Sequence, residues 1–340
     1  MLHIAGSPDR LVPHVKTHKT AEIVKLQLEQ GITKFKCATV AEAEMLAISG
    51  AKWVLIAYQM VGPNIHRLFE LRKKYQDVTF STLIDNESSA SSLNDFSQAQ
   101  DFTSTVFIDV NNGMNRSGHA TDESILSLYR FISNLPNISV SGLHMYDGHI
   151  RSAEFSERKA ESDGAFELAY PLIDIIKKDL GHNPVIVAGG SPTFTVHTLR
   201  DDVWLSPGTN ILWDYGYGDR FDDQPFQYAA LVLTRVISKP SHGTVTIDLG
   251  HKAVAAENPI ENRFRLLNLS HYVVKGQSEE HGVLEVPAET WEKIEIGDIF
   301  YALPYHICPT VALHDYASVI EDGDVIAEWK IVARNRRITI

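Results

Sequence analysis

The stretch KFKCATVAEAEMLAISGAKWVLIAY, residues 34–58, contains the repeating unit that decides the fold. Two short apolar runs, at 34–39 and 53–58, flank a segment of helical period that ends at Gly50, and glycine commonly ends a helix. The preceding segment AEIVKLQLEQG ends in the same way at Gly31. A strand, a helix and a second strand in this order predict parallel strands, because parallel neighbours need a long crossover connection.

Apolar, β-branched runs of this kind recur along the first part of the chain. The predicted strands are residues 11–16, 34–39, 53–58, 79–84, 104–110, 139–146, 184–190 and 203–209. Strand and helix repeated in this way are typical of a (β/α)8 TIM-type barrel, and a doubly wound parallel sheet is the structural alternative. After about residue 222 the runs have period 2, which is typical of antiparallel strands. We therefore expect an α/β protein with a barrel at 1–222 and a mostly antiparallel β domain at 223–340.

The composition favours a small-molecule partner. A formal net charge of -12 argues against general binding to nucleic acid or to anionic lipid, since both need a basic face. The chain has 2 cysteines, no secretory signal pattern and no apolar run long enough to span a bilayer. These features predict a cytoplasmic protein with reduced thiols and no membrane contact.

The stretch PHVKTHKT, residues 13–20, places a lysine at a position suited to catalysis. If residues 11–16 form the first barrel strand, Lys16 lies at its C-terminal end, the face where barrel enzymes build their sites. Burial and the neighbouring His14, His18 and Lys19 would lower the pKa of Lys16, as a Schiff-base or general-base lysine requires. A solvated basic turn is the alternative for these eight residues alone.

Two glycine turns follow the seventh and eighth predicted strands. They are GGSPT at 189–193 and SPGTN at 206–210, whose relevant positions are Gly190, Ser191, Thr193, Gly208 and Thr209. Exposed backbone N–H groups and hydroxyls form an anion cradle, and barrels often hold phosphate in these two loops. Each turn alone is also an ordinary loop. Together with a lysine on the first strand they suggest pyridoxal 5′-phosphate as the cofactor.

A series of motifs runs in order along the chain. The motifs are PHVKTHK, CATVAEAE (37–44), NNGMNRSG (111–118), YDGH (146–149), GGSPT, SPGT, DLGHK (248–252), EEHG (279–282) and PYHICPTVALHD (304–315). Together they resemble the D-threonine aldolase and D-serine dehydratase family. The resemblance implies a metal-activated, homodimeric lyase with an alanine-racemase-like barrel that acts on small D-3-hydroxy amino acids. Family members usually carry a β-domain strand and a helix before the lysine strand, whereas only fifteen residues precede Lys16 here.

The resemblance also implies a role for individual residues. It makes Lys16 the lysine that carries the cofactor covalently, with Lys19 as a neighbour. Tyr146 and His149 would lie beside the cofactor ring and the substrate, and Arg116 would lie near the cofactor. The alternative for Tyr146 is a packed aromatic side chain. For His149 it is a histidine that hydrogen-bonds to backbone, and for Arg116 it is a surface residue.

The pair His306 and Cys308 is the candidate metal site. Residues two apart in an extended strand point to the same side, so an imidazole and a thiolate could grip one ion. These ligands suit zinc, with manganese or cobalt as alternatives, and a buried core thiol is the structural alternative. Within the resembling family a His-x-Cys pair points to dehydration, which gives a 2-oxo acid and ammonia. Aldol cleavage to glycine and an aldehyde is the alternative, and a cofactor-carrying protein without turnover is a further one.

Overall fold

The computed structural model describes residues 1–340 and divides them into two compact units. One unit comprises Met1–Gly208 with Val332–Ile340, and the other comprises Thr209–Ile331. The expected division after residue 222 stays a prediction. No helix in the chain is both long enough and apolar enough to cross a membrane.

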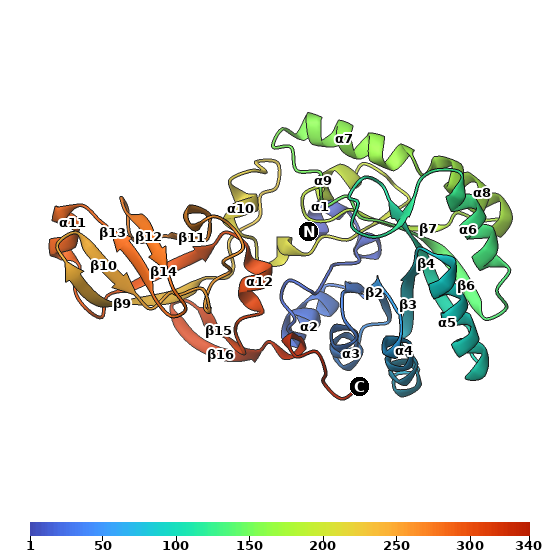
Figure 1. The fold of residues 1–340 in the computed structure, drawn as a ribbon, viewed down its shortest axis with the longest axis horizontal. Coiled ribbons are helices and arrows are strands. Elements are labelled where there is room, and N and C mark those ends of the chain that lie inside the picture. The colour runs from blue at the N-terminus through green and yellow to red at the C-terminus, as the bar shows by residue number, and fades with distance from the viewer. The chain divides into compact units, whose positions relative to one another are not determined.

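The first unit contains the parallel sheet that the sequence predicts (Figure 1). Neighbouring strands follow one another in chain order, and every pair is parallel. A short strand, β5 (His119–Ala120), pairs only with β4. The other strands are β1 (Lys34–Cys37), β2 (Trp53–Gln59), β3 (Thr79–Ile84), β4 (Ser104–Asn111), β6 (Ile138–Met145), β7 (Val185–Ala188) and β8 (Val203–Leu205).

Residues 11–16 close this sheet into a barrel. Leu11 bridges Leu205 of β8, and His14 bridges Lys36 of β1, both in parallel. The backbone N–H of Val12 donates to the Leu205 carbonyl at 2.8 Å. The ladders are short, and neither Pro13 nor Pro207 has an N–H with which to extend them. The closing segment therefore acts as the first barrel strand, and the barrel prediction is confirmed.

Helices follow most of the strands and carry the end signals that the sequence contains. In α3, the Thr39 side chain accepts a hydrogen bond from the Glu42 N–H at 3.1 Å, and Gly50 ends the helix with a positive φ of 103°. The helices of this unit are α1 (Leu2–Ala5), α2 (Ala21–Glu29), α3 (Val40–Ser49), α4 (Pro63–Lys74), α5 (Glu87–Ala99), α6 (Ser124–Ser133), α7 (Phe155–Glu167), α8 (Tyr170–Leu180) and α9 (Phe194–His197), with 3-10 turns at Pro8–Arg10 and Val332–Arg334.

Large apolar side chains fill the barrel interior below its C-terminal rim. Leu55, Leu83, Phe107 and Val187 form one buried cluster. Trp53 packs edge-on against Phe107, with ring centroids 5.7 Å apart. Because alternate residues of a strand face the same side, the next inward positions on these strands lie at the rim.

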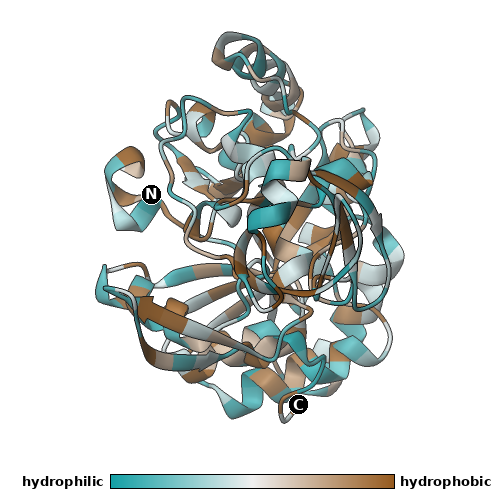
Figure 2. Ribbon diagram, turned by 90° about the vertical axis from the view of Figure 1, so that its left-hand side faces the viewer, coloured by the Kyte–Doolittle hydropathy of each residue, from teal (hydrophilic) through white to brown (hydrophobic).

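The second unit is an antiparallel sheet, as the sequence predicts. Its six strands pair in the order β11-β14-β9-β10-β13-β12, and β15 and β16 form a separate hairpin. Hydrophobic and hydrophilic positions are interspersed along the chain, in keeping with strands that bury one face (Figure 2). The elements are η2 (Thr209–Ile211), α10 (Tyr215–Gly218), β9 (Val232–Ser241), β10 (Thr244–Ile247), η3 (Ile260–Asn262), β11 (Phe264–Leu266), β12 (Val273–Gln277), β13 (Gly282–Glu285), α11 (Ala288–Lys293), β14 (Ile299–Pro304), α12 (Ile307–Val311), β15 (Tyr316–Glu321) and β16 (Asp324–Lys330).

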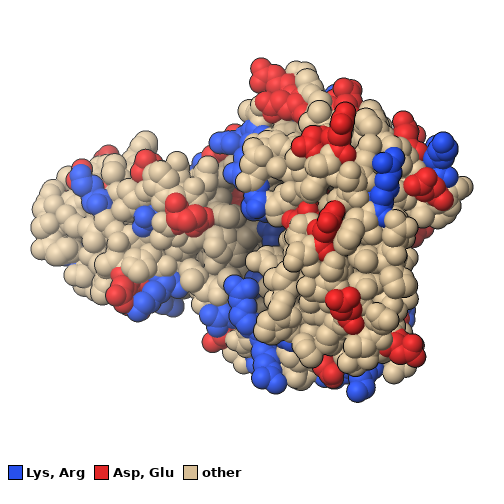
Figure 3. Space-filling model, turned by 45° about the vertical axis from the view of Figure 1, so that its right-hand side comes forward, with Lys and Arg blue, Asp and Glu red and all other residues tan.

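Acidic and basic side chains are interspersed on the face of the molecule that Figure 3 presents. This distribution agrees with the acidic net charge of -12 and with a small-molecule partner.

Candidate active site

Lys16 lies at the C-terminal end of the segment that closes the barrel. It follows His14, which pairs with Lys36 of β1, and its own N–H donates to His14 Nδ1 at 3.3 Å. The Lys16 side chain is partly buried. Its positive charge contributes to lowering the pKa of both His14 and Lys36, so the Lys16 ammonium lies close to both groups. The structure thus brings Lys16 to the barrel rim.

The histidines beside Lys16 do not add positive charge, contrary to the expectation from sequence. Burial lowers the pKa of His14 well below its ordinary value and lowers that of His18 to about 3. Both imidazoles are therefore neutral near pH 7. Lys19 forms an ion pair with the buried carboxylate of Glu42. The charge of Lys16 also acts on Lys36 of the neighbouring strand, a contact that the sequence did not predict.

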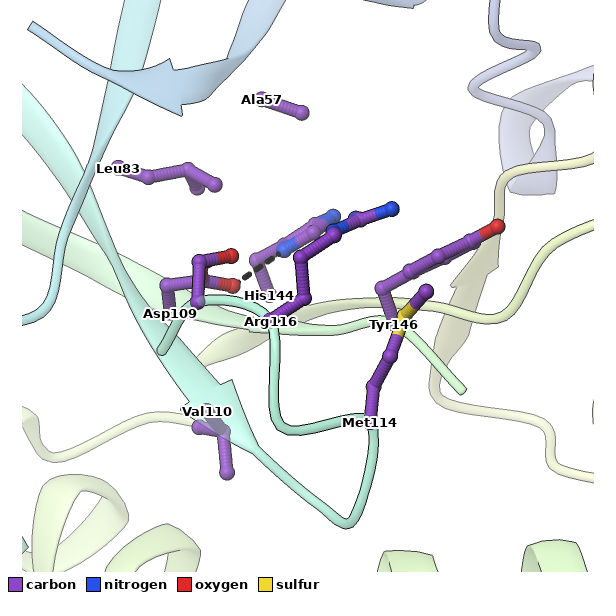
Figure 4. A pocket seen from close by; sticks show the side chains of 9 residues that line it. Ala57, Leu83, Asp109, Val110, Met114, Arg116, His144 and Tyr146 are labelled. Carbon is purple, nitrogen blue, oxygen red and sulfur yellow. Dashed lines mark hydrogen bonds and ion pairs between the residues drawn. The ribbon is translucent and has the colours of Figure 1, made fainter. Parts of the chain in front are cut away.

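A polar pocket lies at the rim, between β4, β6 and the loop that follows β4 (Figure 4). Asp109 and His144 are partners in the sheet register, and His144 Nδ1 lies 2.7 Å from Asp109 Oδ1. The Arg116 guanidinium carbon lies 4.9 Å from the centroid of the Tyr146 ring. The pocket is lined by Ala57, Leu83, Asp109, Val110, Met114, Arg116, Ser117, His144 and Tyr146.

The protonation states of Asp109 and His144 follow from their surroundings. Burial disfavours the charged form of Asp109, but hydrogen bonds from His144, Ser117 and Gln59 outweigh it and lower the pKa of this carboxyl. Burial also lowers the pKa of His144, against the opposing effect of the Asp109 carboxylate. An ionised Asp109 and a neutral His144 place the imidazole proton on Nδ1 and leave Nε2 as an acceptor.

The sequence predicted none of three residues that meet here: Asp109, His144 and Lys36. Lys36 lies behind the Asp109–His144 pair. Its side chain is 1% exposed, and Nζ lies 3.5 Å from His144 Nε2 and donates to the Ser206 hydroxyl. Burial, together with the charge of Lys16, lowers the pKa of Lys36 to about 7. The signal available in the sequence was an ionisable residue near the C-terminal end of an otherwise apolar strand, as in KFKC, VFIDV and GLHMY.

Tyr146 and Arg116 line the pocket, whereas His149 lies to one side. The His149 side chain is exposed, and its ring lies against the loop after β4, where a Cβ built on Gly113 would come within 2.9 Å of Nε2. The predicted roles of these three residues stay predictions.

The two glycine turns meet beside the pocket. The Gly208 N–H donates to Ser191 Oγ at 3.2 Å, and Thr193 Oγ1 donates to the buried carboxylate of Asp147 at 2.6 Å. A Cβ on Gly190 would lie 2.8 Å from Tyr146 Cε2. Any side chain at position 190 would therefore crowd the Tyr146 ring and fill the space above the GGSPT turn.

The close approach of the two turns fits a bound phosphate. A Cβ on Gly208 would lie 3.0 Å from the carbonyl oxygen of His14, so any side chain here would require its neighbours to shift. Small residues and hydroxyls leave a cradle of the type that binds a phosphate group. Thr209, the fifth predicted contact, belongs to the second unit.

Within the second unit, His306 and Cys308 are neighbours, but not on a strand. The expected extended geometry was wrong: His306 caps α12 with an extended backbone, and Cys308 lies inside that helix. The physical reason is Asp214, whose Oδ2 accepts the Ile307 N–H at 3.0 Å and so satisfies the start of the helix. Burial raises the pKa of Asp214 to about 7.

The two side chains still meet. Burial opposes the charged form of His306, but its hydrogen bond with Cys308 and its contact with Glu257 raise the pKa of this imidazole to about 8. His306 Nδ1 lies 2.6 Å from Glu257 Oε1, and Cys308 Sγ lies 3.6 Å from Thr209 Oγ1.

His306 and Cys308 fit a metal site in which the protein supplies two of the ligands. No group of three or more His, Cys, Asp or Glu side chains is arranged to hold an ion. Imidazole and thiolate are ligands that zinc prefers, and a carboxylate on the second ring nitrogen, as Glu257 provides, is common around metal-bound histidine. Two protein ligands would leave positions for water or substrate.

Comparison with known proteins gives the family. Residues 1–215 match the family described as "Alanine racemase, N-terminal domain", and residues 229–320 match the "Putative serine dehydratase domain". D-threonine aldolase from Arthrobacter sp is 28% identical, over 95% of this chain and 85% of its own length. D-threo-3-hydroxyaspartate dehydratase from Delftia sp. is 22% identical, over 93% and 88% of the two chains.

The crystal structure of D-threonine aldolase from Filomicrobium marinum has a TM-score of 0.88 to this chain at 26% identity, and the match covers 98% of this chain and 91% of that one. The match therefore spans both compact units. The chain belongs to the alanine racemase N-terminal domain family, and it carries a second domain of the putative serine dehydratase type.

Proposed function

We propose that this protein is a pyridoxal phosphate- and divalent-metal-dependent lyase that acts on D-3-hydroxy amino acids. The observation that supports the proposal is the position of Lys16 at the end of the segment that closes the barrel, where the neighbouring His14 pairs with Lys36 of β1 and Gly208 of the SPGT turn approaches His14 and Thr17. The relatives named above are an aldolase and a dehydratase of such substrates, which supports this class of reaction.

The cofactor would be held by residues of the barrel rim. Lys16 would bind it covalently, and the loop residues Gly190, Ser191, Thr193, Gly208 and Thr209 would bind its phosphate. Pyridoxal phosphate, when bound, stabilises negative charge that develops at the α-carbon of an amino acid. The amine of Lys16 would be the base that takes up the α-proton. Arg116 and Tyr146 would orient the cofactor, and His149 would contact the substrate.

The metal would be held by His306 and Cys308. Zinc suits this pair, and manganese or cobalt are alternatives. A metal at this pair would act as a Lewis acid on the 3-hydroxyl of the substrate. Glu257 accepts the Nδ1–H of His306, which leaves the other ring nitrogen to the metal.

Dehydration to a 2-oxo acid and ammonia is the reaction we favour, because the second ligand is Cys308 rather than an aspartate. Aldol cleavage is the second candidate, because relatives at 26–28% identity are aldolases, namely D-threonine aldolase and 3-hydroxy-D-aspartate aldolase.

Product analysis separates the two reactions. The protein is loaded with pyridoxal phosphate and zinc or manganese and incubated with D-serine, D-threonine or D-threo-3-hydroxyaspartate. Ammonia with a 2-oxo acid identifies dehydration, and glycine with an aldehyde identifies aldol cleavage. Neither product pair from any of these substrates, with loaded cofactor and metal, contradicts the proposed function.

We also propose a cytoplasmic homodimer. Cys37 and Cys308 form no disulfide, which suits a reducing compartment. The sheet of the second unit exposes apolar side chains that a partner subunit would cover. Leu233 is 54% exposed, and its register partner Tyr301 is 44% exposed.

A further inference from the structure

Lys36 has a buried side-chain amine with no anionic partner. Its Nζ contacts are His144 Nε2, the Ser206 hydroxyl and, at 5.5 Å from the centroid, the face of the Tyr146 ring. No carboxylate lies within ion-pairing distance of Nζ. A buried ammonium that lacks an anionic partner is costly unless a ligand supplies the missing charge.

The nearby carboxylates are already engaged. Asp109 accepts hydrogen bonds from His144, Ser117 and Gln59. Asp147 accepts from Thr193, Ser162 and His197. Neither carboxylate contacts Nζ directly, so Asp109 and Asp147 affect Lys36 only by long-range electrostatic interaction.

The hydrogen bonds of Lys36 lead to the two glycine turns. The Ser206 hydroxyl accepts from Lys36 and donates to the Gly189 carbonyl oxygen at 2.7 Å. Gly189 begins the GGSPT turn, and Ser206 begins the SPGT turn. Lys36 Nζ is therefore linked through one hydroxyl to the first residue of each turn.

We propose that Lys36 is a positioning residue whose ammonium form balances the negative charge of a phosphorylated pyridine cofactor, so that the protein takes up a proton at Lys36 when the cofactor binds. The inference rests on the proposed function and extends it to a residue of β1. Arg116, which lines the pocket, also has no carboxylate partner, and its guanidinium contacts the Tyr146 ring. An anionic ligand therefore completes a pocket in which cations are in excess.

The charge state of Lys36 without ligand follows from all the groups that face it. Burial and the positive charges of Lys16 and Arg116 disfavour the ammonium, and Asp109 and Asp147 favour it. With a pKa of about 7, Lys36 is mostly neutral at pH 8 in the free protein. A bound anion raises this pKa, so binding takes up a proton and affinity falls as the pH rises above about 7. The groups that face Lys36 are Lys16, His14, Asp109, Arg116, His144 and Asp147.

Calorimetry with pyridoxine 5′-phosphate, which lacks the aldehyde and cannot react with Lys16, tests the proposal. Titrations at pH 8 in two buffers of different ionisation enthalpy give the number of protons taken up. Wild type should take up nearly one proton more per site than Lys36→Arg, because the arginine is already charged. Lys36→Arg should still bind pyridoxine 5′-phosphate tightly. Lys36→Met should bind at least about tenfold more weakly and show no excess uptake.

Lys34→Met is the matched control. It removes the same charge from the same strand, but Lys34 pairs with Asp9 and lies over the Trp204 ring. It should behave as wild type. Lys36→Gln serves as a second neutral variant if circular dichroism shows that Lys36→Met is misfolded.

Equal proton uptake by wild type and the neutral variants overturns the inference, as does binding by Lys36→Arg that is as weak as that of Lys36→Met. The proposed function is tested separately by wild type alone. If wild type forms no visible lysine adduct with pyridoxal phosphate, the proposed function fails. If the adduct forms but no uptake depends on Lys36, only the role of Lys36 fails.

Discussion

Replacing Asp109 with asparagine should destabilise the barrel, because this carboxylate organises the pocket floor. Its side chain is 5% exposed and accepts from His144 Nδ1 at 2.7 Å, Gln59 Nε2 at 2.9 Å and Ser117 Oγ at 3.0 Å. Asparagine offers one acceptor oxygen to these donors and adds a donor of its own. At least one charge-assisted bond is lost, and each contributes roughly 1.5–3 kcal/mol. We expect a loss of about 2–4 kcal/mol in unfolding free energy.

The lowered pKa of Asp109 predicts how the stability loss in Asp109→Asn depends on pH. The folded-state pKa of Asp109 is lowered, so its stabilisation is complete above the unfolded value near 3.8 and is lost as the pH falls through the folded pKa. The part of the deficit that comes from the Asp109 carboxylate itself should therefore be constant from pH 8 to 5 and shrink only in stronger acid. The same variant removes a charge that favours the Lys36 ammonium, so the pKa of Lys36 should fall further.

Urea unfolding followed by circular dichroism measures the effect. Asp174→Asn, at an exposed position of α8, removes the same charge and should change stability by less than about 0.5 kcal/mol. A deficit for Asp109→Asn that is no larger than that of Asp174→Asn would refute the reasoning, because it would mean that the three hydrogen bonds make no net contribution.

Three further predictions concern the proposed activity. Borohydride reduction after loading with pyridoxal phosphate should fix the label on Lys16, and peptide mapping that finds it on Lys19 instead would contradict the assignment. Chelation of the metal should abolish turnover, and so should Cys308→Ala. In both cases the visible absorbance of the bound cofactor should persist, since the lysine and the glycine turns hold the cofactor. Near-normal, chelator-insensitive turnover in Cys308→Ala would show that the thiol is not a ligand. Light scattering at micromolar concentration should return a dimer, and a monomer would leave the exposed Leu233 and Tyr301 without their proposed cover.

The sequence by itself determined the order of the strands and the residues at their ends. Runs such as 53–58 and 79–84 were predicted because apolar alternation and helix-ending glycines are local signals. Parallel strands place all their C-terminal ends on one rim, so the order of the strands alone assigns Lys16 and the two glycine turns to one face of the barrel.

Only the tertiary structure decided which side chains meet at that rim. Lys36, His144 and Asp109 come from three strands, and their contact depends on the register of the closed barrel. No local pattern specifies that register, because it is set by the packing of the whole interior.

The conformation around Cys308 was decided in the same way. The sequence spacing from His306 fits a strand, but the Asp214 carboxylate, distant in sequence, caps Ile307 and starts a helix. A single hydrogen bond from a remote segment outweighs a weak local preference, since short segments have little conformational bias of their own.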